Sequence, residues 1–150
     1  DEVIRQFSNM TAITSLSPGG VGPLLVNELL RKRELTALCD EVIRPFYQTR
    51  CELAVSWLKT SVNDARLHIH LPEGAIFLWL WFEGLSISTS QLYDELKKEG
   101  LLVVPGKYFF PGQEPGDEHA ESCIRMNYVQ SEQDLRKGID ILARVLRRFW

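Results

Sequence analysis

The sequence has no long apolar run and no excess of basic residues, and each absence excludes a class of protein. The longest apolar stretch, AIFLWLWF at 75–82, is far shorter than the roughly 20 residues of a membrane-spanning helix. Lys and Arg together number 17 against 20 Asp and Glu, and the net charge is −3. A protein that binds a phosphate backbone has a basic face or stripe instead. We therefore expect neither a membrane nor a nucleic acid as a partner.

Cysteine is also scarce, with Cys39, Cys51 and Cys123 far apart in the chain. An odd number at wide spacing favours free thiols in a reducing compartment over a disulfide framework, so we expect a cytoplasmic protein. No signal peptide is visible, and the chain starts without Met inside a helix-like pattern, DEVIRQF. A fragment cut from a longer protein would start in this way, and so would a processed chain.

The length and the turn signals predict one domain over residues 1–150 that opens with helices. A cluster of turn formers at 15–24 precedes the helical stretch LLVNELLRKREL, with Ser17 as a possible cap. A second helix is predicted over 35–61, and Pro45 should kink it or split it in two. A helix of this length is unusual for a small domain, which indicates that it leads in from another part of a protein.

Four short strands are predicted in the second half of the chain, at 66–71, 75–82, 101–105 and 123–129. Helices accompany them. One covers 86–100, with a capping box at Ser88 and Gln91 and with Gly100 after its end. The other follows the cap formed by Ser131 and Asp134 and has an apolar face. The expected fold class is α+β, with a small, mostly antiparallel sheet of about four strands covered by helices and a long kinked helix leading in.

Most candidate sites in the sequence carry little weight. His68 and His70 lie on one face of a strand, but without a Cys or carboxylate at ligand-like spacing we predict no metal site. The glycine-rich SPGG segment at 17–20 opens a helix and matches neither nucleotide-binding fingerprint. A plain helix-entry loop and a phosphate or interface contact are about equally good interpretations of it. No Ser-His-Asp or Cys-His spacing suggests a nucleophile.

Arg125 is the strongest candidate, because it lies within the apolar strand SCIRMNYV at 122–129, which contains no acidic residue. A guanidinium cannot lose its charge, so a strand that half-buries it needs an anion nearby. One interpretation is recognition of a small carboxylate beside the flexible loop at 106–122, with two parallel hydrogen bonds from the rigid strand. The other is an internal ion pair with an acid such as Glu73 or Glu83. The residues alone do not decide between them.

Three motifs in order resemble the C-terminal small domain of the fold-type I aminotransferases, which depend on pyridoxal phosphate. The motifs are PEGAIFLWLWF, LLVVPGKYFFPG and CIRMNYV, and the likeness extends from about Asn9 to Phe149. The resemblance implies a dimeric enzyme whose N-terminal large domain is absent from these residues. It implies transfer of an amino group from an apolar amino acid to pyruvate, which gives alanine, so the partners are amino acid and 2-oxo acid substrates.

The resemblance also implies roles for individual residues. Arg125 falls on the arginine that pairs with the substrate α-carboxylate. Phe77, Tyr108 and Phe109 fall beside the substrate, where they would line an apolar pocket. The SPGG loop falls where the family has a segment near the subunit interface. This position implies that the loop approaches the cofactor phosphate of a neighbouring subunit, with Ser17, Gly19 and Gly20 as the contact residues.

This sequence departs from the family in the residues that carry out the reaction. The family needs a lysine that forms a Schiff base with the cofactor, in a Ser-x-x-Lys setting, and an Asp that pairs with the pyridinium nitrogen. None of the lysines here lies in such a setting: Lys32, Lys59, Lys97, Lys98, Lys107 and Lys137. We therefore expect this chain alone neither to bind the cofactor nor to transaminate. The alternative is a free-standing α+β module that binds an amino acid at Arg125 without chemistry.

Overall fold

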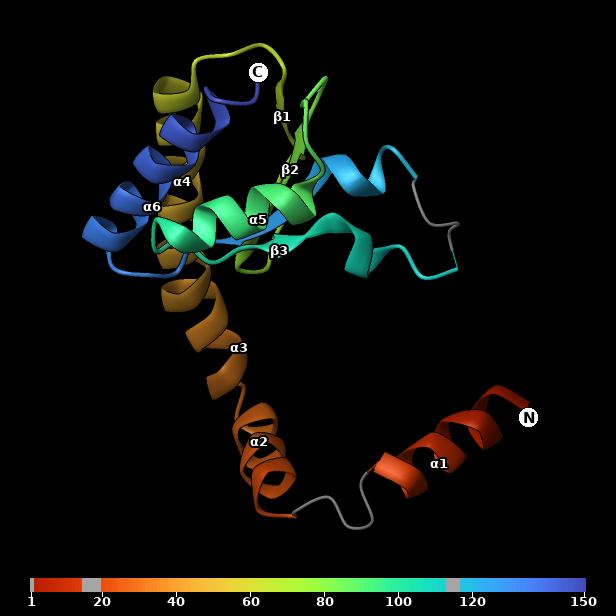
Figure 1. Ribbon diagram of the computed structural model, residues 1–150. Helices are drawn as coiled ribbons and strands as arrows, with labels where there is room; N and C mark the ends of the chain where they lie inside the picture. The colour runs from red at the N-terminus through yellow and green to blue at the C-terminus, as the bar shows by residue number, and fades with distance from the viewer. Residues whose placement is uncertain (1, 15–19, 113–116) are drawn as a thin grey trace. The chain divides into compact units, whose positions relative to one another are not determined.

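The computed structural model describes residues 2–14, 20–112 and 117–150 (Figure 1). The chain divides into two compact units, Asp1–Arg44 and Pro45–Trp150, which are described separately. The expectation of one domain over the whole chain stays a prediction. Within the described ranges, no helix is long and apolar enough to cross a membrane.

The first unit consists of helices that expose most of their described apolar side chains. They are α1 (Glu2–Thr14), α2 (Val21–Arg31) and the short α3 (Glu34–Leu38), followed by a π-helical turn, η1 (Cys39–Ile43). Helix α2 has no buried residue among those described. Its exposed apolar side chains are Val21, Leu24, Leu25, Val26, Leu29 and Leu30. Exposed apolar surface of this kind often marks an interaction site.

The helix predicted over 35–61 is found as α3, η1 and α4 (Arg44–Val62) in direct succession. The helix type changes just before Pro45, which has no N–H to donate to the carbonyl four residues back. In the π-helical turn the N–H of Arg44 instead donates to the carbonyl of Cys39, five residues earlier. The helix type thus changes at this point, and the predicted kink or split stays a prediction.

The second unit contains the sheet. Strands β1 (Leu67–Ile69), β2 (Phe77–Phe82), β3 (Val104–Pro105) and β4 (Cys123–Asn127) lie in the order β1-β2-β4-β3, and every pair is antiparallel. All four predicted strands are present, shorter than expected, and the predicted α+β class is confirmed. The central position of β4 puts it between β2 and β3, so its side chains have neighbours on both sides.

Helices α4, α5 (Thr89–Lys98) and α6 (Glu132–Leu146) pack on one face of this sheet (Figure 1). Alternation along the strands sends every second residue into that core, since successive side chains of a strand point to opposite faces. The predicted caps are confirmed: Ser88 and Gln91 form a capping box on α5, and the Ser131 side chain accepts from the N–H of Asp134 on α6. The sheet contributes Leu78, Leu80, Phe82, Ile124 and Met126 to the core, and Tyr128, which follows β4, joins them.

The opposite face of the sheet carries the remaining residues of the same strands, among them Trp79, Trp81 and Arg125. Two short 3-10 helices, η2 (Gly106–Phe109) and η3 (Ala120–Ser122), lie in the segment beside this face. Gly106 is the point of closest approach. A Cβ at this position would lie 2.7 Å from the carbonyl oxygen of Ala120 and 2.7 Å from the Cβ of Cys123. Only glycine lets η2 come this close to β4.

We expect Gly106→Ala to lower the free energy of unfolding by about 2 kcal/mol, because an added methyl group overlaps two backbone segments. Gly74→Ala is the matched control, since a Cβ there meets no atom within 4 Å, and it should change the stability little. Urea unfolding of the two variants measures the difference. Equal stability of both variants would contradict the close approach at Gly106.

Candidate functional site

The candidate site forms around Arg125, the third residue of β4. Its Cα lies opposite Trp79 on β2 and opposite Val104 on β3. The neighbours of Arg125 in sequence, Ile124 and Met126, are buried in the core, so alternation directs the guanidinium to the face away from helices α4, α5 and α6. A strand paired on both sides holds the Cα of Arg125 in a fixed place.

Two aromatic rings contact the guanidinium. Its Cζ atom lies 4.1 Å from the ring centre of Phe77, at the start of β2, and 4.5 Å from the ring centre of Phe109, in η2. Phe109 also meets Trp79 edge to face, with 5.4 Å between ring centres. Each cation–π contact contributes roughly 0.5–2 kcal/mol and favours a charged guanidinium. The rings do not accept conventional hydrogen bonds from the N–H groups of the guanidinium, which still need oxygen acceptors.

A partner anion for Arg125 is missing from the part of the chain that the structure describes. The Nε atom is buried, and no described residue accepts a hydrogen bond from it. Of the two acids considered as internal partners, Glu83 pairs with His68 at 2.9 Å, and Glu73 is exposed and forms no described ion pair with Arg125. A buried donor without an acceptor costs about 1–3 kcal/mol, more when charged.

The residues predicted beside the substrate are brought together only in part. Phe77 and Phe109 both contact Arg125. Tyr108 is 70% exposed, and its ring lies near its neighbour, with the Nζ atom of Lys107 5.5 Å from the ring centre. The pocket-lining role of all three stays a prediction. The sequence analysis missed Trp79, although the two-residue period of β2 already places it on one face with Phe77.

The predicted phosphate contact falls mostly outside the described residues, since Ser17 and Gly19 are not among them. Gly20 is described. It is exposed and is the N-cap of α2, where no side-chain hydrogen bond caps the helix. Its assignment to a cofactor phosphate stays a prediction.

The described residues do not fit a complete site for pyridoxal phosphate. A lysine that forms a Schiff base works as the free amine, which favours a desolvated setting or a neighbouring cation. Every lysine of this chain is instead exposed. Two of them are paired with an acid one turn away on the same helix, Lys32 with Glu28 and Lys98 with Glu95. We derive no chemical step through the cofactor from these residues.

The two strand histidines do not form a described metal site. Among the described residues no group of three His, Cys, Asp or Glu is placed to hold an ion. His68 stacks on Trp81, with 4.4 Å between ring centres, and its Nε2 atom lies 2.9 Å from Glu83. Burial raises the pKa of the Cys123 thiol, which makes it a weak nucleophile. These side chains therefore contribute to the packing of this face.

Comparison with known proteins gives consistent matches to aminotransferases, although no family model matches. A curated relative, the valine–pyruvate aminotransferase of Escherichia coli (strain K12), is 43% identical over all 150 residues, which span 36% of its length. The aspartate/prephenate aminotransferase of Thermus thermophilus is 26% identical over 98% of this chain. The chain thus spans about a third of the length of these curated relatives, and it matches their C-terminal part.

Solved structures give the same result. The crystal structure of valine–pyruvate aminotransferase from Salmonella typhimurium LT2 matches with a TM-score of 0.86 and 43% identity. The match covers 98% of this chain and 38% of that chain. A putative amino-acid aminotransferase from Psychrobacter arcticum matches with a TM-score of 0.87 and 45% identity, over 99% of this chain and 34% of that chain.

The absence of a described partner for Arg125 predicts an unusual effect of its removal. Arg125→Met removes a charge without an acceptor but also two cation–π contacts, so we expect the gain and the loss to offset roughly and the stability without ligand to change little. Arg50→Met is the matched control, because Arg50 also lies over a phenylalanine ring, that of Phe46, but donates to the carbonyl of Gln130 at 2.6 Å. It should lower the free energy of unfolding by about 1–2 kcal/mol. If urea unfolding shows a large loss for Arg125→Met, Arg125 has a structural partner and the site is wrongly assigned.

Proposed function

The chain belongs to the fold-type I aminotransferases, and we propose that in the intact protein it binds the α-carboxylate of the substrates through Arg125. The observation that carries this proposal is the buried Nε of Arg125, for which no described residue supplies an acceptor. A carboxylate supplies both the charge and the two acceptor oxygens that the guanidinium fork needs. The substrates of the intact protein are thus amino acids and 2-oxo acids, which share this group.

The surroundings of Arg125 suit such a ligand. The rings of Phe77 and Phe109 reduce contact between the guanidinium and water, and charge pairs interact more strongly where water is excluded. The paired strand β4 fixes the direction of the fork, so a bound carboxylate would be oriented as well as held. Arg125 therefore sets the position of the substrate Cα, and chemistry takes place on groups supplied from elsewhere in the protein.

We infer valine and pyruvate as the substrates of the intact protein, with alanine as a product, from the names of the valine–pyruvate aminotransferases that the chain matches. In this proposal Phe77, Tyr108 and Phe109 lie along the apolar side chain of the amino acid. An apolar pocket of this kind separates side chains by only about 1–3 kcal/mol per methylene. A preference for valine over its closest analogues is therefore expected to be modest.

The cofactor of the intact protein, in this proposal, is pyridoxal phosphate, which acts as an electron sink when bound. The lysine that forms its Schiff base lies outside these residues, since every lysine here is exposed. This chain alone is then inactive. Ser17, Gly19 and Gly20 are assigned to the cofactor phosphate of a neighbouring subunit.

The proposed partners of the chain are the N-terminal large domain of the same protein and a second copy in a homodimer. The exposed apolar side chains of α2 support this assignment, because surface of this kind is stable when another part of the protein covers it. We place the protein in the cytoplasm, where its three free cysteines would stay reduced.

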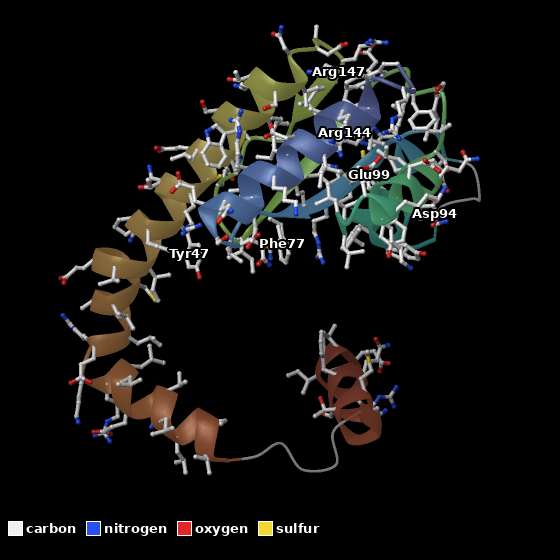
Figure 2. All side chains as sticks on the ribbon, turned by 60° about the vertical axis from the view of Figure 1, so that its left-hand side comes forward. Tyr47, Phe77, Asp94, Glu99, Arg144 and Arg147 are labelled. Carbon is white, nitrogen blue, oxygen red and sulfur yellow. The ribbon has the colours of Figure 1, made fainter. Side chains whose placement is uncertain are left out.

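In the full-length protein, Arg125→Ala should lower kcat/KM for valine at least about 100-fold, because the buried carboxylate loses a charged, two-bond partner. Arg125→Lys should restore little, since an ammonium lacks the fork. Steady-state kinetics with valine and pyruvate measure both. Arg144→Ala removes the same charge from α6, where Arg144 pairs with Glu99 at 2.9 Å (Figure 2), and should leave kcat/KM unchanged. An unchanged kcat/KM in Arg125→Ala would rule out the proposed role.

A further inference from the structure

The turn that leads into β2 contains a strained residue next to the site. Ala75 has φ 62°, in the left-handed region that residues with a Cβ rarely adopt. It comes two residues before Phe77, whose ring lies 4.1 Å from the Cζ atom of Arg125. A strained conformation persists only where its surroundings hold it. Something must therefore hold this turn if Phe77 is to stay on the guanidinium.

Tyr128 supplies that hold from the core side of the sheet. Its hydroxyl donates to the carbonyl of Ala75 at 2.6 Å, and its backbone N–H donates to the carbonyl of Ile76 at 3.3 Å. The side chain is 2% exposed, so water does not compete for the hydroxyl. Burial raises the pKa of Tyr128 further above its usual value, so the hydroxyl stays protonated well beyond neutral pH, where any tyrosine can donate.

The two ends of this connection lie close in the chain: Arg125 is in β4, and Tyr128 directly follows its last residue, Asn127. Arg125 and Tyr128 are three residues apart, and alternation puts them on opposite faces of the sheet. Tyr128 thus belongs to the packed core, while Arg125 faces the site. Between them the paired positions Phe77 and Asn127 join the start of β2 to the end of β4. Phe77, labelled in Figure 2, is the first residue of β2, so the turn directly precedes it.

We propose that Tyr128 is a positioning residue for the carboxylate site: its hydroxyl holds the turn at Ala75, and the turn holds Phe77 against Arg125. This inference rests on the function proposed above for Arg125. Tyr128 touches no ligand in this account. It acts by keeping the aromatic wall of the guanidinium in place before the substrate arrives, which is preorganisation of a binding site.

The test is Tyr128→Phe in the full-length holoenzyme, with valine as the varied substrate. Loss of one buried hydrogen bond should raise KM about three- to tenfold, with kcat changed less than about twofold. The inhibition constant of 3-methylbutanoate, a branched monocarboxylate without an amino group, should rise by a similar factor. Tyr93→Phe is the matched control on α5, where the tyrosine ring lies near Lys97, and should leave both constants unchanged.

A second variant separates positioning from a general loss of stability. Ala75→Gly removes the strain at φ 62°, so the turn no longer depends on the hydroxyl, and the double variant should recover most of the KM of the unmodified protein. If Tyr128→Phe only lowers the amount of folded enzyme and leaves KM unchanged, the inference is wrong. If the double variant has the same raised KM as Tyr128→Phe alone, Tyr128 does not act on Phe77 by holding the turn at Ala75.

The Arg125 variants distinguish this inference from the function on which it rests. If Arg125→Ala raises KM strongly and Tyr128→Phe does not, Arg125 binds the carboxylate and only the positioning role fails. If Arg125→Ala leaves both the KM for valine and the inhibition constant unchanged, the proposed function fails first.

Discussion

The charge of Arg125, which the protein cannot remove, is the constraint on which the arrangement of this sheet face depends. A guanidinium on a doubly paired strand must find acceptors, and the described residues supply two aromatic rings and no acceptor for its Nε. An arrangement of this kind costs stability unless a ligand completes it. Residues that bind or catalyse are often kept at such a cost, because function selects them against stability.

The fold makes this arrangement possible by keeping the core on the other face. Leu78, Leu80 and Ile124 pack against helices α4, α5 and α6, so the stability of the sheet does not depend on Arg125. The site face is then free to hold aromatic side chains at a chosen spacing. Gly106 allows Phe109 to complete this face. The close approach of Gly106 to Cys123 brings the segment that carries Phe109 next to β4.

Much of this architecture is predictable from the sequence, because it depends on local patterns. Alternation predicts β1, a short apolar run predicts β2, and the capping box predicts the start of α5 at Ser88. The charge within an apolar strand singles out Arg125. Contacts between distant segments are not predictable in this way: no local pattern joins Tyr128 to Ala75, 53 residues earlier. The left-handed conformation of Ala75 and the π-helical turn before Pro45 are also missed, since no local pattern in the sequence marks either one.

The most direct test of the account is a crystal structure of the full-length protein with 3-methylbutanoate bound. The account predicts the carboxylate at Arg125, with its two oxygens about 2.8 Å from guanidinium nitrogens and the rings of Phe77 and Phe109 still in contact with the guanidinium. It is contradicted if the ligand binds elsewhere, or if an acidic side chain of the protein itself pairs with Arg125.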